Sequence, residues 1–185
     1  DVVHFDSKIH TFRQIGRKAV ARALSDCAAM AVQPTAVLVS VALPKDLPSP
    51  SVEELFQAMH VVAEEFGAGV AGGDTARWDG PLAIDISIAA EPYPGIAPIK
   101  RDGARINDRL YTTGRLGGSI LAKHLAFVPR IQEARAIAAR LGGDLHAMID
   151  ISDGLALDLW RMCEASGVGA LLDETSLSSV MSSDA

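Results

Sequence analysis

Two carboxylates, Asp150 and Asp153, stand where the apolar pattern of the chain changes its period. Residues 146–151 form a short, mostly apolar run that predicts a buried strand, and from Leu155 onward apolar residues recur at helical spacing. Ser152 or Asp153 can cap that helix, whose free N–H groups attract anions, while the carboxylates can hold Mg²⁺ against those anions. The junction therefore predicts a site for metal and phosphate, with an ordinary helix cap as the alternative.

A further carboxylate, Asp26, lies late in a segment with helical spacing of its apolar residues. The four residues that follow it, 27–30, are Cys, Ala, Ala and Met. We therefore expect the Asp26 carboxylate to lie in an apolar neighbourhood, where it needs a partner that a cation would supply. The alternative is a solvated polar residue near the end of a helix.

Paired glycines precede a fourth carboxylate in the segment Gly72-Gly73-Asp74-Thr75. The segment follows residues 69–71, where we expect a short strand to end. Glycines permit close approach of a ligand to the backbone, and Asp74 adds an oxygen ligand, although a plain turn has the same composition. A glycine-rich segment over residues 114–118 resembles a phosphate-binding loop but matches neither the Walker nor the dinucleotide spacing.

The charge balance argues against a nucleic-acid partner. Lys and Arg total 17 and Asp and Glu total 23, which gives a net charge of −6 without basic clustering. An acidic protein that binds phosphates needs local positive charge, and divalent cations are the simplest source. Cys27 and Cys163 lie in apolar helical contexts, which predicts buried free thiols. No apolar stretch is long enough for a membrane span and no signal sequence is visible, so we expect a bacterial-type cytoplasmic protein.

The coarse pattern of the chain alternates helices and strands. Proline and glycine density over residues 92–98 marks a linker between two domains. Asp102, Asp108 and Asp158 read as turn or helix-surface groups. The expected helices cover residues 11–31, 119–127, 130–141 and 153–165, with one more opened by a capping box at Ser51–Glu54; the expected strands cover residues 36–43, 82–90, 108–113, 146–151 and 167–172.

In order and spacing, three of these segments resemble the thiamine-monophosphate kinase family. They are Ser25-Asp26-Cys27-Ala28-Ala29-Met30, Gly72-Gly73-Asp74-Thr75 and Asp150-Ile151-Ser152-Asp153-Gly154-Leu155. The resemblance extends to Val3-His4-Phe5, to Arg101-Asp102-Gly103-Ala104 and to Asp108-Arg109-Leu110-Tyr111-Thr112-Thr113-Gly114, although Asn107 replaces the glycine usual before Asp108. The similarity thus covers nearly all 185 residues.

This resemblance implies an α/β (α+β) protein with the two-domain fold of aminoimidazole ribonucleotide synthetase, in which mixed sheets carry flanking helices. Residues 1–95 would form an N-terminal ATP- and metal-binding domain, incomplete at its start, that pairs into a dimeric barrel, so a homodimer is expected. Residues 96–185 would form a C-terminal domain, incomplete at its end. The family's Asp-Asp and Thr-Asp ligands would lie at or before Asp1, and its Gly-Glu-Asp element after Ala185.

The activity that the resemblance implies is ATP-dependent phosphorylation of thiamine monophosphate to thiamine diphosphate by direct, Mg²⁺-assisted phosphoryl transfer. No protein nucleophile is expected, because the acceptor phosphate is already ionised. Several Mg²⁺ ions would be bound, with Asp26, Asp74 and Asp150 sharing ions and Asp153 holding a further one. The ATP-binding residues would be Gly73, Asp74, Arg101 and Ser152, and His4 would contact the thiamine substrate.

Two alternatives remain open from the sequence. Related enzymes of the same superfamily, which make aminoimidazole ribonucleotide or selenophosphate, use similar carboxylates for ATP with a different second substrate. The alternative that is not an enzyme is a nucleotide-binding or structural fragment, because the family's flanking ligand segments are not present here in full.

Overall fold

The computed structural model describes residues 1, 3–119 and 123–181, which divide into two compact units. The first unit contains Asp1–Leu24, Gln33–Glu91 and His124–Pro129. The second unit contains Ser25–Val32, Pro92–Lys123 and Arg130–Ala185. In the described residues no helix is long and apolar enough to cross a membrane.

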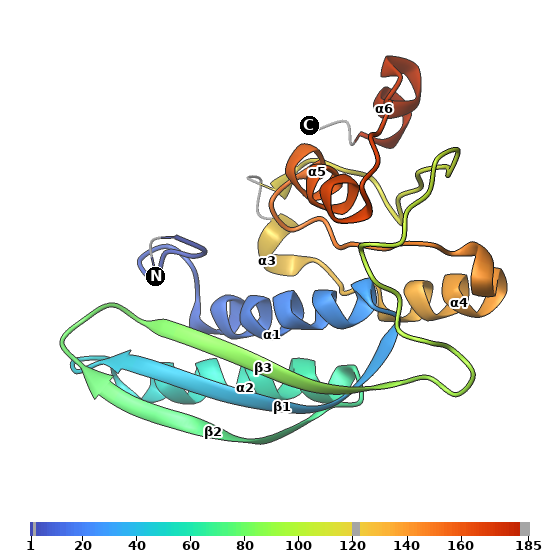
Figure 1. Cartoon of the computed structure of the whole chain (residues 1–185). Helices are drawn as coiled ribbons and strands as arrows, with labels where there is room; N and C mark the ends of the chain where they lie inside the picture. The colour runs from blue at the N-terminus through green and yellow to red at the C-terminus, as the bar shows by residue number, and fades with distance from the viewer. Residues whose placement is uncertain (2, 120–122, 182–185) are drawn as a thin grey trace. The chain divides into compact units, whose positions relative to one another are not determined.

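The first unit is built on a three-stranded mixed sheet with strand order β2-β1-β3 (Figure 1). The strands are β1 (Val32–Pro44), β2 (Gly69–Trp78) and β3 (Ala83–Pro92). β1 pairs in parallel with β2, and alternate β1 residues, from Val37 to Leu43, are buried. Both strands expected at residues 36–43 and 82–90 are therefore confirmed. The nearly continuous apolar run at 36–43 predicts a strand covered on both faces, and that is wrong, because Leu38 is 49% exposed. Along β3 the alternate residues Ile84, Ile86 and Ile88 are half-buried.

Two helices of this unit run alongside the sheet, α1 (Phe12–Ala29) and α2 (Ser49–Glu65) (Figure 1). Both were expected from their apolar spacing. Thr11 and Gln14 form a reciprocal cap at the start of α1, with Gln14 N donating to Thr11 Oγ1 at 3.2 Å and Thr11 N donating to Gln14 Oε1 at 3.0 Å. The predicted capping box at Ser51–Glu54 is wrong. A proline in the first turn presets the helical φ angle, so α2 already begins at Ser49.

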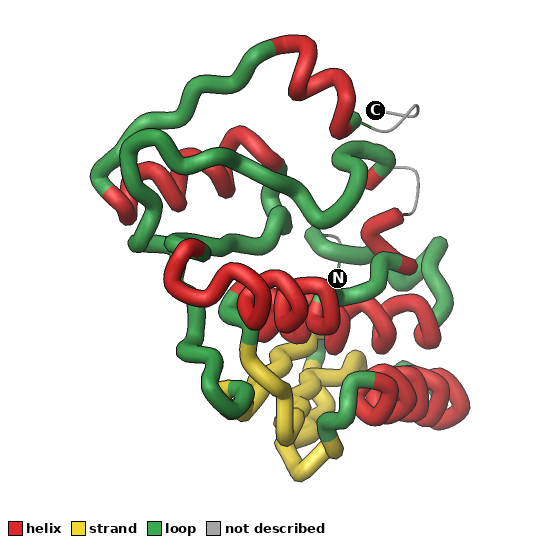
Figure 2. The backbone as a smooth tube through the Cα atoms, turned by 90° about the vertical axis from the view of Figure 1, so that its right-hand side faces the viewer, coloured by secondary structure: helices red, strands yellow, loops and turns green. Residues whose placement is uncertain are grey.

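The second unit contains mainly helices joined by long loops (Figure 2). The helices are α4 (Ile131–Leu141), α5 (Leu155–Ser166), α6 (Glu174–Val180) and the 3₁₀ turn η2 (Gly142–Asp144). α4 and α5 confirm two predicted helices, whereas α6 was not expected. In the first unit, α3 (His124–Ala126) forms part of the helix expected over residues 119–127, of which residues 120–122 lie outside the described part.

The predicted strands at residues 108–113, 146–151 and 167–172 are wrong, because the described chain has no named strand beyond β3. An extended segment becomes a strand only when its backbone groups pair in a ladder. Segment 146–151 donates one backbone bond, from Met148 N to Lys100 O at 3.2 Å. Leu116 likewise pairs with Met181 only as an isolated bridge. An apolar run predicts burial, but the partner strand must come from elsewhere in the molecule.

Replacing Gly16 with alanine tests the contact between α1 and α2. A Cβ atom at Gly16 would lie 2.4 Å from the carbonyl oxygen of Leu55, which is backbone and cannot swing away. Alanine gains up to about 1 kcal/mol in helix propensity, but overpacking costs roughly 1–3 kcal/mol, so we expect a net loss of about 1–2 kcal/mol in the free energy of unfolding.

Urea denaturation measures this change, with Gly69→Ala as control because a Cβ atom there has no neighbour within 4 Å. A Gly16→Ala protein as stable as the parent would contradict the close helix contact.

Candidate functional site

The second unit brings two of the predicted carboxylate segments together. Ser25 Oγ donates to Asp150 Oδ2 at 3.1 Å across 125 positions of sequence. Asp26 directly follows Ser25 near the end of α1, so the predicted ligands Asp26 and Asp150 come from neighbouring segments of one unit. Asp150 is partly buried and Asp26 is exposed.

The apolar surroundings expected for Asp26 are therefore wrong. The side chains of Cys27 and Ala28 are buried, but the Asp26 carboxylate lies on the solvent side of the helix. Helical geometry explains this difference, because adjacent residues point in directions about 100° apart. An exposed carboxylate keeps its hydration and remains accessible to a cation.

A buried carboxylate, Asp158, organises the turn that carries Asp150 and Asp153. Its Oδ2 accepts hydrogen bonds from three consecutive backbone N–H groups, those of Ser152 at 3.0 Å, Asp153 at 2.9 Å and Gly154 at 3.1 Å. Asp158 is only 1% exposed, so reading it as a helix-surface group is wrong. The predicted cap by Ser152 or Asp153 is also wrong, because Gly154 occupies the N-cap position without a side-chain cap.

These bonds change the electrostatics expected at the start of α5. The N–H groups of residues 152–154 already bind the Asp158 carboxylate, so the positive end of the helix faces an internal anion. Arg161 Nη1 donates to Asp158 Oδ1 at 2.9 Å and to Asp153 Oδ2 at 2.6 Å. The bond to Asp153 is the main reason that the pKa of Arg161 is raised. Ser152 retains its exposed side-chain hydroxyl for contact with a ligand.

The carboxylates fit Mg²⁺ by their chemistry, because Mg²⁺ prefers oxygen ligands. Within residues 1, 3–119 and 123–181, no group of three His, Cys, Asp or Glu side chains is arranged to hold a metal by itself. Mg²⁺ is usually held by one or two carboxylates together with water and substrate phosphates. The arrangement therefore suits a metal that binds together with a phosphorylated ligand.

The first unit carries the predicted glycine-aspartate segment inside a strand. β2 continues through Gly72 and Gly73, so the strand end expected at residue 71 is wrong. A bulge precedes Gly72, after which Gly73 pairs with Val39 and Asp74 with Ser40. A Cβ atom at Gly73, where φ is +149°, would lie 1.8 Å from the carbonyl oxygen of Val39. The glycine thus permits close strand approach, and Asp74 is exposed.

His4, also in the first unit, lies beside two basic side chains of α1. Its Nε2 is 3.3 Å from Arg22 Nη1, and Lys18 Nζ donates to its carbonyl oxygen. Burial is the main cause of a lowered pKa at Lys18, and Arg22 adds to it. The helical spacing of Lys18 and Arg22, four residues apart, was a sequence signal for this basic group, but nothing in the sequence linked it to His4.

Arg101 opens a segment that is tied to α5 within the second unit. Ser166 Oγ donates to the Arg101 carbonyl oxygen at 3.0 Å and accepts from Ala104 N at 3.1 Å. A Cβ atom at Gly103 would lie 2.2 Å from the carbonyl oxygen of His146, so this segment also lies against the chain leading to Asp150. The Arg101 side chain is exposed.

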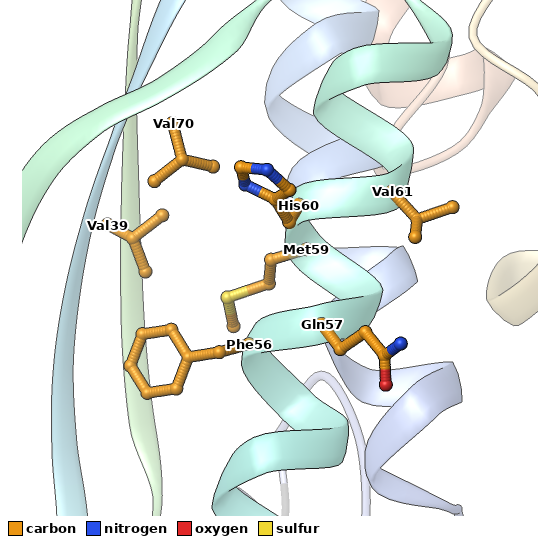
Figure 3. A pocket seen from close by; sticks show the side chains of 7 residues that line it. All are labelled: Val39, Phe56, Gln57, Met59, His60, Val61 and Val70. Carbon is orange, nitrogen blue, oxygen red and sulfur yellow. The ribbon is translucent and has the colours of Figure 1, made fainter.

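A hollow of about 430 Å³ in the first unit contains none of the predicted site residues (Figure 3). Side chains of α2 and of the strands β1 and β2 line it, namely Val39, Phe56, Gln57, Met59, His60, Val61 and Val70. Its lining is mostly apolar. It lacks the carboxylates and the hydrogen-bond donors that a nucleoside triphosphate and its metal require.

The cysteines provide a chemical test of the packing beneath Asp26. Both are free; Cys27 is buried, while Cys163 is only partly buried, which corrects that part of the prediction. Burial, with a smaller contribution from Asp26, raises the pKa of the Cys27 thiol to about 11. The thiolate is the reactive form, so we expect iodoacetamide at pH 7.5 to label Cys163 well before Cys27. Peptide mass mapping measures both sites, and labelling of Cys27 at the same rate as Cys163 would contradict the packing.

Comparison with known proteins matches the chain to two family models. The model for the N-terminal domain of AIR synthase related proteins matches residues 1–91, and the model for their C-terminal domain matches residues 101–184. Thiamine-monophosphate kinase of Rhodopirellula baltica is 40% identical over 173 residues, which cover 94% of this chain and 53% of that protein. The chain spans about half the length of the curated relatives that it matches.

Solved structures show the same fold. Thiamine-monophosphate kinase from Stenotrophomonas maltophilia K279a is 26% identical with a TM-score of 0.76, covering 90% of this chain and 58% of that one. AaThiL complexed with AMPPCP and TMP is 23% identical with a TM-score of 0.73 and the same coverage. Both domain models thus match in order over nearly all of the chain, and the chain belongs to the AIR synthase related family.

Proposed function

We propose that the protein to which this chain belongs transfers the γ-phosphoryl group of ATP to thiamine monophosphate and so forms thiamine diphosphate. The single observation that carries this proposal is the 40% identity with a thiamine-monophosphate kinase over 94% of the chain. The juxtaposition of Ser25-Asp26 with Asp150 in one unit supports it from the structure.

The proposed reaction joins two anions, so charge neutralisation and alignment are the main tasks of the protein. Mg²⁺ bound to the phosphates would supply charge neutralisation. Asp26, Asp74 and Asp150 are proposed as its ligands, with Asp153 holding a further ion. Binding of a metal to Asp153 would compete with Arg161, whose Nη1 lies 2.6 Å from Asp153 Oδ2.

Nucleotide contacts are proposed for Gly73, Asp74, Arg101 and Ser152. Since the Ser152 N–H donates to Asp158, its hydroxyl is the group proposed to contact ATP. The exposed guanidinium of Arg101 suits bidentate contact with phosphate. Near His4, the positive charges of Lys18 and Arg22 suit the phosphate of thiamine monophosphate.

The test of the function is a product assay on the complete protein with ATP, Mg²⁺ and thiamine monophosphate. We expect thiamine diphosphate to form in step with ADP. ATP hydrolysis that depends instead on an aminoimidazole ribonucleotide precursor or on selenide would replace this proposal with a sister activity of the superfamily.

Substitution of the carboxylates separates metal ligands from surface charges. Replacing Asp26, Asp74 or Asp150 with Asn keeps the shape of the side chain but removes its charge. We expect turnover to fall by about 100-fold or more at the Mg²⁺ concentration used for the parent protein, while the fold stays intact. Glu53→Gln, at an exposed carboxylate of α2, serves as the control. Full activity of one of the three variants at saturating Mg²⁺ would remove that residue from the site.

Replacing His4 with Ala tests a contact with the thiamine substrate. Because His4 is exposed, its loss leaves no buried cavity, and we expect a nearly unchanged melting temperature. The KM for thiamine monophosphate should rise roughly tenfold while the KM for ATP stays the same. His60→Ala, at an exposed histidine of α2, is the matched control. A clear loss of stability with normal substrate kinetics would make His4 structural.

We also propose a homodimer that pairs through the outer face of the first unit's sheet. Along β3 the residues Ala83, Asp85, Ser87 and Ala89 are exposed, and Leu38 of β1 is 49% exposed. Apart from Asp85, these residues are small or apolar, so pairing would cover apolar surface. Light scattering on the complete protein should give twice the monomer mass. Leu38→Arg should produce monomers and Val61→Arg on α2 should not, whereas a dilution-independent monomer mass in the parent would contradict the dimer.

A further inference from the structure

Among the described residues, Asp158 is the one charged residue that is buried, and it lies in the first turn of α5. A buried carboxylate is costly unless hydrogen bonds and an opposite charge satisfy it. Here, four donors do so, namely three backbone N–H groups on Oδ2 and Arg161 on Oδ1. Removing a single partner would leave this charge buried without compensation, so the donors and Asp158 must keep a fixed arrangement.

The three N–H groups belong to the turn between Asp150 and the start of α5. When Ser152, Asp153 and Gly154 all donate to one oxygen atom, their backbone angles are fixed together. Gly154 adopts a φ of +114°, a conformation that other residues rarely reach. Asp158 therefore holds the backbone that carries Asp153 and follows Asp150, although Asp158 comes five and eight residues after them.

Arg161 extends the same arrangement to a side chain. Its Nη1 contacts Asp158 on one side and Asp153 on the other, at 2.9 and 2.6 Å. Asp153 is thus held at two points. Its backbone N–H donates to Asp158, and its carboxylate accepts from Arg161, which Asp158 also binds. Both oxygens of Asp158 are occupied by these donors, so Asp158 is poorly placed to be a metal ligand itself.

We propose that Asp158 is a positioning residue, which holds the turn carrying Asp150 and Asp153 in the geometry that binds the metal of a metal-nucleotide complex. This inference rests on the proposed function. A purely structural cap would explain the burial and the hydrogen bonds equally well, but replacing it would not change the affinity for metal. The quantity to measure is therefore the change in metal affinity when Asp158 is replaced.

Asp158→Asn in the complete protein is the informative change. An amide has one acceptor oxygen, so it cannot serve both the three N–H groups and Arg161. We expect hydrogen exchange at the amides of residues 152–154 to accelerate while the amides of α4 are unchanged. Mn²⁺ binding, followed by electron paramagnetic resonance with a nonhydrolysable ATP analogue, should weaken about tenfold or more, as for other residues that orient metal ligands.

Glu164→Gln is the matched control, because Glu164 is an exposed carboxylate on the same helix. Gly154→Ala is a second variant for the case in which Asp158→Asn does not fold. It leaves Asp158 intact and meets no neighbouring atom within 4 Å, but it opposes the positive φ on which the turn depends. Gly154→Ala should therefore also weaken Mn²⁺ binding.

The outcomes separate the two claims. If the parent binds Mn²⁺ with the analogue, and Asp158→Asn and Gly154→Ala bind it equally well, the positioning role is overturned while the proposed function stands. If the parent itself binds no Mn²⁺ in the presence of the analogue, both claims are overturned. Weaker binding in both variants with normal binding in Glu164→Gln supports the positioning role.

Discussion

One buried carboxylate, Asp158, organises the part of the second unit that carries the candidate ligands. From the first turn of α5 it accepts hydrogen bonds from the N–H groups of Ser152, Asp153 and Gly154, which lie in the turn just before the helix and at its N-cap. The cost of burying its charge is offset by these bonds and by Arg161. The backbone N–H groups of residues 152–154 are thus occupied by a carboxylate of the protein itself. This agrees with a proposed site in which carboxylates bind phosphate through Mg²⁺.

The sequence predicted α1, α2, β1 and β3 of the first unit, because the signals for these elements are local, whereas only the first residues of β2 were expected. The helical spacing that led to α1 and α2 and the alternation that led to β3 depend on each segment burying one face against the rest. The strands expected in the second unit failed for the opposite reason. Residues 146–151 are apolar, yet a strand requires a partner backbone, and the only backbone bond described for that segment is from Met148 to Lys100. The spacing of apolar residues indicates which face of a segment is buried, but it does not indicate which backbone the segment pairs with.

For the candidate site, two of the predicted segments do lie together, but the surroundings predicted for their residues were wrong. The segments around Asp26 and Asp150 lie together, as their shared chemistry suggested, but Asp26 is exposed rather than surrounded by apolar side chains. Gly73 serves strand pairing with Val39, a need that no local pattern reveals. Asp158 was misread because an Asp four residues after a glycine at a helix start looks like an ordinary surface residue. What distinguishes Asp158 is that it lies on the buried face of the helix, together with Leu159 and Met162.

The central claim is that the protein's carboxylates and the nucleotide's phosphates hold Mg²⁺ jointly. The direct measurement is calorimetric titration of the complete protein with Mg²⁺, with and without a nonhydrolysable ATP analogue. Since the described residues offer no three-ligand cage, binding should be weak without the analogue and at least about tenfold tighter with it, after correction for metal bound by the free analogue. Equally tight Mg²⁺ binding in the absence of the nucleotide analogue would contradict the account.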